Sequence, residues 1–269
     1  MSDAAPSRYS DEQRLAFGRV AELYDRARPS YPAAAIDALV EYGALTPGAR
    51  IVEVGAGTGK ATELLAARGL DVVAIEPSAE MAALARVKLV RWAGVTVVES
   101  AFEDWIPAER LAAVVSVQAW HWVDPAVRYV RAHQALGPGA MLAAVWSFPD
   151  WERCPQRNAL SRAYRDTTVE LRADFPMHPD SEPIRLAGDW KAEIAAAQGF
   201  GAAEIRAFRW SERYTSEAYV ELVQTHQDHI LLGERDRAAI LDAITRCIDE
   251  RGGHLQLPLV TYVCLARRL

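Results

Sequence analysis

In the first half of the chain, apolar residues gather in short runs, and the segments between these runs place their apolar residues at helical spacing. Runs of this kind are typical of strands buried on both faces of a parallel sheet. They cover residues 51–54, 70–76, 95–98, 112–118 and 141–146. Strands that alternate with helices indicate an α/β fold, and we expect a doubly wound, mostly parallel sheet of about seven strands.

The second half of the chain continues this alternation but interrupts it once. Helices are expected at 158–171, 191–199, 216–232 and 235–251, and strands around 205–208 and 255–266. Residues 147–191 do not follow the sheet pattern, and we expect an α-helical insertion there. We also expect a flexible N-terminus at residues 1–16, because chain ends are poorly ordered unless something holds them.

A glycine-rich turn, Gly55-Ala56-Gly57-Thr58-Gly59, joins the first strand to the helix that follows it. Glycine has no Cβ, so the backbone can adopt positive φ and a ligand can approach it closely. In doubly wound sheets the ligand binds at the carboxyl end of the strands. The turn therefore predicts a nucleotide-type site in a Rossmann-like sheet.

The residues around this turn separate three classes of ligand. A phosphate-binding P-loop needs glycine where Val54 stands and a hydroxyl residue where Ala61 stands. The dinucleotide fingerprint needs its last glycine at Lys60. Glu53, just before the turn, would repel a pyrophosphate but attract a cation. S-adenosylmethionine (AdoMet) carries an ammonium and a sulfonium and no phosphate, so the pattern favours AdoMet.

A second carboxylate, Glu76, ends the strand at residues 70–76. It lies at about the 20-residue distance at which an acid reaches a ribose in such folds. One carboxylate can accept hydrogen bonds from both ribose hydroxyls. A solvated strand end is the alternative for Glu76 by itself, but Glu53 and the glycines favour the cofactor site.

These motifs resemble those of a known family. Residues 52–59 (VEVGAGTG) followed by 75–81 (IEPSAEM) resemble the class I AdoMet-dependent methyltransferases, and more narrowly the type 11 group of small-molecule enzymes. The resemblance implies one methyltransferase domain with one antiparallel strand in its sheet. The implied parts are a cofactor-binding core at 17–146, a substrate lid at 147–191 and a C-terminal part of the sheet and helices at 192–269, together 17–269.

The resemblance also implies cofactor contacts. The segment around Tyr24 and Arg28 resembles a YDxxRPxYP motif that closes over the cofactor, with Arg28 paired to its carboxylate; a solvated arginine and a core tyrosine are the alternative. The loop after the third strand would hold the adenine, although Ser100 stands where many relatives carry Asp. The expected contacts are Tyr24, Arg28, Glu53, Gly55, Gly57, Thr58, Gly59, Glu76, Pro77, Met81, Ser100, Ala101, Phe102 and Gln118.

Two candidate catalytic residues, Trp120 and His121, follow the fourth strand, beside the expected position of the sulfonium. An unperturbed histidine titrates near pH ~6.5, so His121 would deprotonate or orient the acceptor; packing that fixes the loop is the alternative. The indole faces of Trp120 and Trp122 would attract the sulfonium, with ordinary aromatic packing as the alternative.

Composition limits the partners. The 269 residues have a net charge of −6 and no marked basic patch, which argues against nucleic acid. Polar residues interrupt the longest apolar runs, so we expect no membrane span. Cys154, Cys247 and Cys264 are far apart and lack metal-ligand spacing, so we expect free thiols, no metal and a cytoplasmic protein. We expect a monomer or a homodimer.

Several arginines in residues 147–191 give an indication of the charge of the methyl acceptor. They include Arg153, Arg157, Arg162, Arg165 and Arg172. Such a set would suit an anionic acceptor such as an acid, and a solvated helix surface is the alternative. We expect methyl transfer from AdoMet to O, N or C of a small molecule, with S-adenosylhomocysteine as product. A protein that binds AdoMet without catalysis and, less favoured, an NAD-dependent oxidoreductase are the rival functions.

Overall fold

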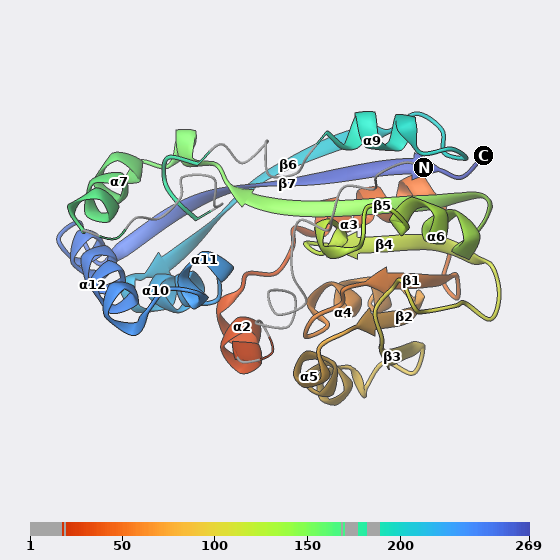
Figure 1. The fold of residues 1–269 in the computed structure, drawn as a ribbon, viewed down its shortest axis with the longest axis horizontal. Coiled ribbons are helices and arrows are strands. Elements are labelled where there is room, and N and C mark those ends of the chain that lie inside the picture. The colour runs from red at the N-terminus through yellow and green to blue at the C-terminus, as the bar shows by residue number, and fades with distance from the viewer. Residues whose placement is uncertain (1–17, 19, 168, 170–176, 182–188) are drawn as a thin grey trace.

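The computed structural model describes residues 18, 20–167, 169, 177–181 and 189–269, so the N-terminus expected to be flexible at 1–16 lies outside the described residues. One seven-stranded sheet has the order β3-β2-β1-β4-β5-β7-β6 (Figure 1). The strands are β1 Arg50–Val54, β2 Asp71–Glu76, β3 Val95–Glu99, β4 Leu111–Val117, β5 Leu136–Pro149, β6 Glu204–Thr215 and β7 His254–Arg267. Strands β1 to β5 pair in parallel, and β7 is antiparallel to both β5 and β6. The Rossmann-like, mostly parallel fold is therefore confirmed.

Helices cover both faces of the sheet. In β4 the neighbouring residues Val114 and Val115 are fully buried in two different apolar clusters, so each face of the strand has its own core. One cluster includes residues of α3 and α4, and the other includes residues of α6 and α9. The helices are α2 Ala21–Ala27, α3 Ala33–Gly43, α4 Lys60–Ala66, α5 Ala79–Leu89, α6 Arg128–Ala135, α7 Arg157–Asp166, α9 Trp190–Ala196, α10 Ser216–Gln224, α11 Gln227–Ile230 and α12 Glu234–Asp249, with short 3-10 helices η2 Trp120–Trp122 and η3 Trp151–Arg153.

The last three strands are longer than the others and join two parts of the molecule. β5 and β7 have 14 residues each and β6 has 12, whereas β1 has 5. Their far ends carry α7, α10, α11 and α12, which we call the helical lobe (Figure 1). A third apolar cluster fills this lobe, with Leu160, Tyr219 and Ile244 at its centre. The lobe thus combines the expected insertion with C-terminal helices, and the boundaries of a substrate lid stay a prediction.

The helix expected at 216–232 is divided into α10 and α11, which is a correction to the predicted elements. Thr225 ends α10, and its hydroxyl donates to the carbonyl of Leu222 at 2.6 Å. A threonine side chain that bonds a nearby carbonyl offers the backbone an alternative to the helical pattern. His226 then takes an extended conformation. The break places α11 beside the strand ends that form the site described below.

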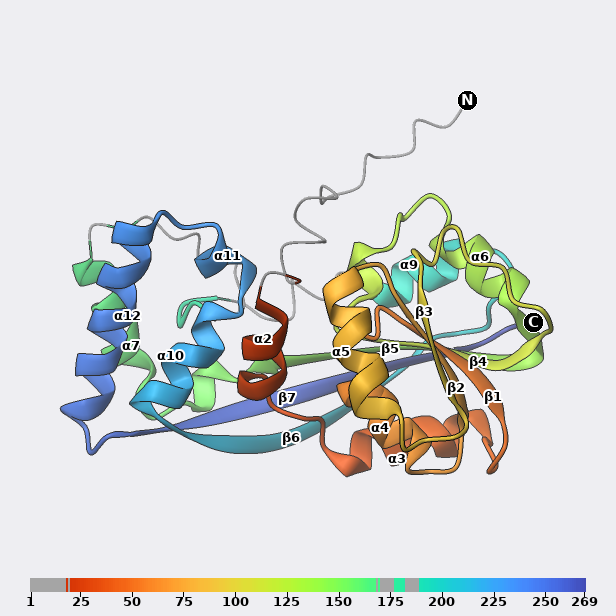
Figure 2. The same cartoon turned by 90° about the horizontal axis from the view of Figure 1, so that it is seen from below.

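Helix α2 lies between the two parts of the molecule (Figure 2). Asp25 accepts a hydrogen bond from Thr58 at 2.6 Å and pairs with Lys88 of α5. Arg26 pairs with Glu221 of α10 at 2.9 Å. α2 therefore connects the sheet core to the helical lobe.

Three features of the described residues concern membranes, metals and thiols. No helix among them is long and apolar enough to cross a membrane. These same residues contain no group of three or more His, Cys, Asp or Glu that could hold a metal ion. Cys154, Cys247 and Cys264 are all free and buried.

Candidate functional site

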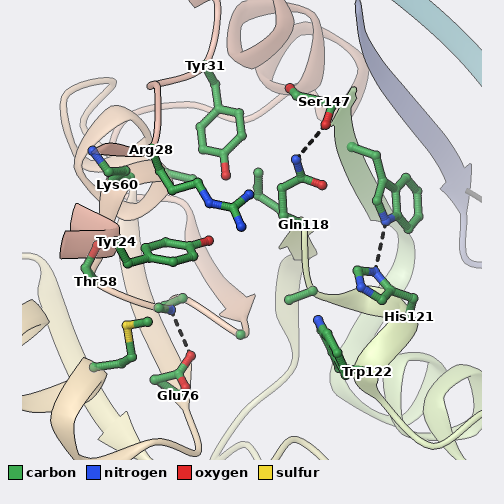
Figure 3. Close-up of a pocket in the computed structure, with 18 of the residues that line it drawn as sticks. Tyr24, Arg28, Tyr31, Thr58, Lys60, Glu76, Gln118, His121, Trp122 and Ser147 are labelled. Carbon is green, nitrogen blue, oxygen red and sulfur yellow. Dashed lines mark hydrogen bonds between the residues drawn. The ribbon is translucent and has the colours of Figure 1, made fainter. Parts of the chain in front are cut away.

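A cavity of about 500 Å³ lies at the carboxyl ends of the parallel strands, and residues of α2 and of the helical lobe also line it. Figure 3 shows part of its wall. The carboxyl ends of the strands are where a doubly wound sheet binds its ligand. All the expected cofactor contacts except Gly59 lie on its wall, and so does His121. Residues expected from separate motifs therefore meet in one place.

The glycine turn has the backbone conformation that its sequence predicts. Gly55, Gly57 and Gly59 have φ of 71°, 58° and 83°. A Cβ on Gly55 would lie 2.3 Å from the Cβ of Ala119, so the turn packs directly on the loop after β4. A Cβ on Gly57 would meet no atom within 4 Å, so a ligand can approach the backbone there. Gly59 is the N-cap of α4 rather than part of the cavity wall.

Glu76 ends β2 with its carboxylate fixed against this turn. Its Oε2 accepts a hydrogen bond from the amide of Gly57 at 2.8 Å, and its Oε1 accepts one from the amide of Ser78 at 2.9 Å. The side chain lines the cavity and is almost fully buried. A carboxylate acts as an acceptor at about four lone-pair positions. Those positions suit a ligand that brings hydroxyl donors.

Glu53 is less available as a charge than its sequence position suggests. It is 1% exposed, and its Oε2 accepts a hydrogen bond from Thr62 at 2.5 Å. Burial raises the pKa of Glu53 to about 8 against the opposing effect of the Thr62 bond, and the nearby Glu76 acts in the same direction as burial. In this structure Glu53 is therefore mostly protonated at neutral pH, because desolvation disfavours its ionised form.

The loop after β3 contributes Ser100, Ala101 and Phe102 to the cavity wall, on the side where Met81 of α5 also lies. Ser100 donates its hydroxyl to the carbonyl of Ala101 at 2.9 Å. Phe102 is 3% exposed and packs on Trp120, with ring centroids 6.0 Å apart. This end of the cavity thus has an apolar surface and backbone groups, which suits a purine.

Trp120 lies in the core and is not on the cavity wall. It is fully buried and packs edge-on against Tyr129, with ring centroids 5.7 Å apart. This placement corrects the interpretation of Trp120 as a face for the sulfonium, because the ring is enclosed by other aromatic side chains. Trp122, two residues later, does line the cavity.

His121 lines the cavity, and a neighbouring strand fixes its ring (Figure 3). The indole Nε1 of Trp146, in β5, donates a hydrogen bond to His121 Nδ1 at 3.2 Å. An indole nitrogen is a donor only, so Nδ1 acts as the acceptor and carries no proton. In neutral His121 the proton is therefore on Nε2, which makes that atom a hydrogen-bond donor.

The loop that carries His121 is held at its start by Gln118. This residue has a positive φ of 60°, which is uncommon for a residue other than glycine. Its side-chain amide donates to the carbonyl of Ser147 at 2.8 Å, in β5 (Figure 3). β5 thus fixes both ends of the loop, through Ser147 and Trp146.

Tyr24 and Arg28 reach the cavity from α2 and the residue that caps it. The Arg28 guanidinium carbon lies 4.9 Å from the centroid of the Tyr24 ring. Its Nε donates to the hydroxyl of Thr225 at 2.8 Å, and its Nη2 donates to the carbonyl of the same residue at 2.9 Å. Arg28 thus contacts the helical lobe, and its Nη1 donors take no part in these two bonds.

The described arginines of the 147–191 segment do not line the cavity. Arg153, Arg162 and Arg165 are exposed. Arg157 donates to the carbonyl of Pro179 at 2.9 Å. Arg172 lies outside the described residues. The described arginines of this segment therefore offer an anionic acceptor no contact in the cavity.

Several residues on the cavity wall were not predicted from the sequence. Tyr31 and Lys60 lie on the side of the glycine turn (Figure 3), and burial lowers the pKa of Lys60. The position of Lys60 directly after the turn was a usable signal. The helical lobe and the long strands add Met177, Tyr214, Leu222, His226, Gln227, Asp228, Leu231, Leu257 and Leu259. No local motif marks these residues.

The site is chemically suited to AdoMet. The open backbone at Gly57 and the fixed carboxylate of Glu76 offer contacts for a nucleoside. The wall also carries two aromatic residues, Tyr24 and Trp122, and the π-face of an aromatic ring attracts cations such as a sulfonium.

Comparisons with known proteins agree with this assignment. Residues 52–144 match the model of a methyltransferase domain family. An uncharacterized methyltransferase of Mycobacterium tuberculosis is 31% identical over 96% of this chain and 97% of its own length. An uncharacterized methyltransferase-like protein of Schizosaccharomyces pombe is 26% identical over 84% of each chain.

Solved structures show the same fold. A structure described as a type II methyltransferase from Anaeromyxobacter dehalogenans has a TM-score of 0.61 at 21% identity, covering 90% of this chain and 97% of that one. An AdoMet-dependent methyltransferase from Thiobacillus denitrificans, in complex with S-adenosylhomocysteine, has a TM-score of 0.51 at 16% identity, covering 91% and 96%. The chain therefore belongs to the class I AdoMet-dependent methyltransferases of the type 11 group, and S-adenosylmethionine is its cofactor.

Proposed function

We propose that this methyltransferase acts on a small molecule that binds in the same cavity as AdoMet, on the side of the helical lobe. The supporting observation is that one cavity is lined by the glycine turn and Glu76 on one side and by residues of α10 and α11 on the other. A cavity of about 500 Å³ is within the range of small-molecule sites.

The cofactor contacts divide among three groups of residues. Glu76 would accept hydrogen bonds from the ribose hydroxyls, since its fixed carboxylate lines the cavity and a carboxylate can accept several hydrogen bonds. Ser100 to Phe102 would hold the adenine. Arg28 would bind the carboxylate of the methionine part through the donors that Thr225 does not use.

AdoMet supplies a methyl group on a positively charged sulfur. A lone pair on the acceptor O, N or C forms the new bond to the methyl carbon while the carbon–sulfur bond breaks and its electron pair returns to sulfur. An acceptor that carries a proton on that atom releases it to water or to a base. Alignment of the two reactants can supply roughly 7–11 kcal/mol of the barrier, so the main task of the chain is to position them.

His121 is best suited to position the acceptor. Its neutral ring donates from Nε2, because Trp146 occupies Nδ1. A donor on the cavity wall can hold an oxygen or nitrogen of the acceptor, whereas a general base needs a free lone pair. We therefore propose an orienting role for His121 rather than proton abstraction.

The experiment is calorimetry followed by turnover. S-adenosylhomocysteine should bind and raise the melting temperature, because a ligand that binds only the native state stabilises it by mass action. NADH should do neither. Labelled methyl from AdoMet should then appear in a small molecule from a metabolite panel. Binding without transfer to any panel member would favour the AdoMet-binding alternative, and binding of NADH alone would overturn the proposal.

A further inference from the structure

The end of the cavity formed by the helical lobe is mostly apolar. Its wall combines leucines of α10 and β7 with residues from the neighbouring segments. The apolar members are Met177, Leu222, Leu231, Leu257 and Leu259. Such a surface favours the apolar part of a ligand by roughly 25 cal/mol for each Å² removed from water.

Asp228 places a carboxylate on this apolar wall. It is 6% exposed, and its Oδ1 lies 2.9 Å from His229 Nδ1 and accepts from the His229 amide at 3.1 Å. Its Oδ2 is buried and has no hydrogen-bond partner among the described residues. A buried acceptor without a partner costs free energy, so this oxygen favours a ligand that brings a donor.

Tyr214 is a second polar group of the same kind on the wall. Its side chain is 8% exposed, and its hydroxyl is buried without a partner among the described residues. Burial raises the pKa of Tyr214, so the hydroxyl is neutral at physiological pH. Its ring packs against Tyr219 with centroids 5.9 Å apart, which holds the hydroxyl in place.

The charges around this end disfavour an anion. His226, which also lines it, has a pKa well below the ordinary value because of burial and the nearby Arg28, so it is neutral. The Arg28 guanidinium donates twice to Thr225 and keeps its positive charge, which in the proposed function is paired with the carboxylate of the cofactor. Lys60 belongs to the side of the glycine turn (Figure 3). A carboxylate or phosphate placed beside Asp228 would therefore meet a like charge at close range, which is unfavourable.

We propose that this end of the cavity is the acceptor-binding subsite and that it selects a small, mainly apolar molecule carrying an amine or hydroxyl donor. The donor binds the carboxylate of Asp228, and the apolar part lies among the leucines. This inference rests on the proposed function, because it assigns the acceptor class of the same site. It replaces the anionic acceptor that the arginines of residues 147–191 had suggested.

Three ring compounds of similar size test the proposal: 2-phenylethylamine, 4-ethylphenol and 3-phenylpropionate. Each is titrated by calorimetry into the protein loaded with S-adenosylhomocysteine. The amine and the phenol should bind at least about tenfold more tightly than the acid, because a hydrogen bond to a charged group typically contributes that much. This comparison uses the wild-type protein, so its result does not depend on whether a variant folds.

A variant then assigns the preference to one residue. Asp228→Asn should weaken binding of the amine about tenfold and leave the affinity for S-adenosylhomocysteine unchanged. Asp180→Asn is the matched control, since Asp180 accepts from Ser161 at 2.7 Å outside the cavity; it should keep the wild-type preference.

The outcomes separate the two proposals. Tighter binding of 3-phenylpropionate, binding of none of the three compounds, or an unchanged preference in Asp228→Asn would overturn the subsite. In each case S-adenosylhomocysteine still binds, so the proposed function stands. Failure of S-adenosylhomocysteine to bind the wild-type protein would instead overturn the proposed function.

Discussion

Trp146 donates its indole N–H to Nδ1 of His121, and this bond joins the fifth strand to the loop after the fourth. Trp146 is 1% exposed and stacks on Trp190 with ring centroids 4.2 Å apart, so it has little freedom to move. The tautomer of His121 is thus decided by a core residue rather than by solvent.

The first prediction concerns this tautomer. In the NMR spectrum of ¹⁵N-labelled protein, neutral His121 should show its proton on Nε2, and Trp146→Phe should allow both tautomers because Nδ1 loses its donor. The alternative is that turnover by wild-type protein rises with pH through the range in which histidine titrates, and that this rise is absent in His121→Asn. That result would show that His121 acts as a base and that the orienting role is wrong.

Glu76 gives a prediction about cofactor affinity. Glu76→Ala should weaken binding of AdoMet by about 1–3 kcal/mol, because the ribose hydroxyls would lose their acceptor. Glu99→Ala is a matched control, since Glu99 ends the adjacent strand β3 but is exposed and pairs with Arg86 at 3.6 Å. Calorimetry should find the same dissociation constant for AdoMet in Glu99→Ala as in wild-type protein. Equal dissociation constants for Glu76→Ala and wild-type protein would remove Glu76 from the site.

Glu53 gives a prediction about pH. Its pKa is raised from 4.5 to about 8 in the folded protein. Between these values the native state keeps a proton that the unfolded chain has released, so the free energy of unfolding of the ligand-free protein should fall as pH rises. The contribution is at most about 1.4 kcal/mol per pH unit.

Glu53→Gln should lack this contribution, because an amide does not titrate. Urea unfolding at several pH values between about 5 and 8 measures it. The stability difference between Glu53→Gln and wild-type protein should grow in favour of the variant as pH rises. If the free energies of unfolding of the two proteins change in parallel with pH, Glu53 is ionised in the native state.

Two arginines near α2 give the fourth prediction. Arg28→Ala should reduce both AdoMet affinity and thermal stability, because a part-buried guanidinium with two bonds to Thr225 is lost. Arg26→Ala should change stability by less than about 1 kcal/mol, since the Arg26 side chain is 61% exposed and its pair with Glu221 lies on the surface. Differential scanning calorimetry with and without S-adenosylhomocysteine distinguishes them. If the two variants show the same melting temperature and the same stabilisation by S-adenosylhomocysteine, α2 and Arg28 form only a surface helix without a role in cofactor binding.

The cofactor side of the site was predictable because its signals are local. Strand, turn and helix follow one another within residues 50–66, and a glycine at positive φ is needed where the sequence has one. The acid at the end of the next strand lies at a fixed chain distance from this turn. The burial of Glu53 could not be predicted from the sequence. The sequence shows that the residue is an acid, but its protonation depends on how deeply the fold encloses its carboxylate.

The acceptor side was not predictable for a different reason. Tyr214, Asp228 and Leu257 come from β6, α11 and β7, and they meet only because the last strands extend beyond the parallel sheet. The bond between Trp146 and His121 depends in the same way on the pairing of β4 with β5. Helical periodicity showed that residues 216–232 are helical but not that Thr225 divides them.

The central position of β7 has a consequence for biosynthesis. Among the strands that the structure describes, β7 alone pairs with β6, and it also covers the open edge of β5, with Met141 opposite Arg267. During translation the ribosome releases β5 more than a hundred residues before the end of its partner, so a nascent chain exposes a long apolar strand edge that invites association with other chains. Neither the sheet nor the helical lobe can close until residues 254–267 have emerged. Chaperone dependence and yield in expression should therefore respond to mutations in β7 more than to mutations in the cofactor motifs.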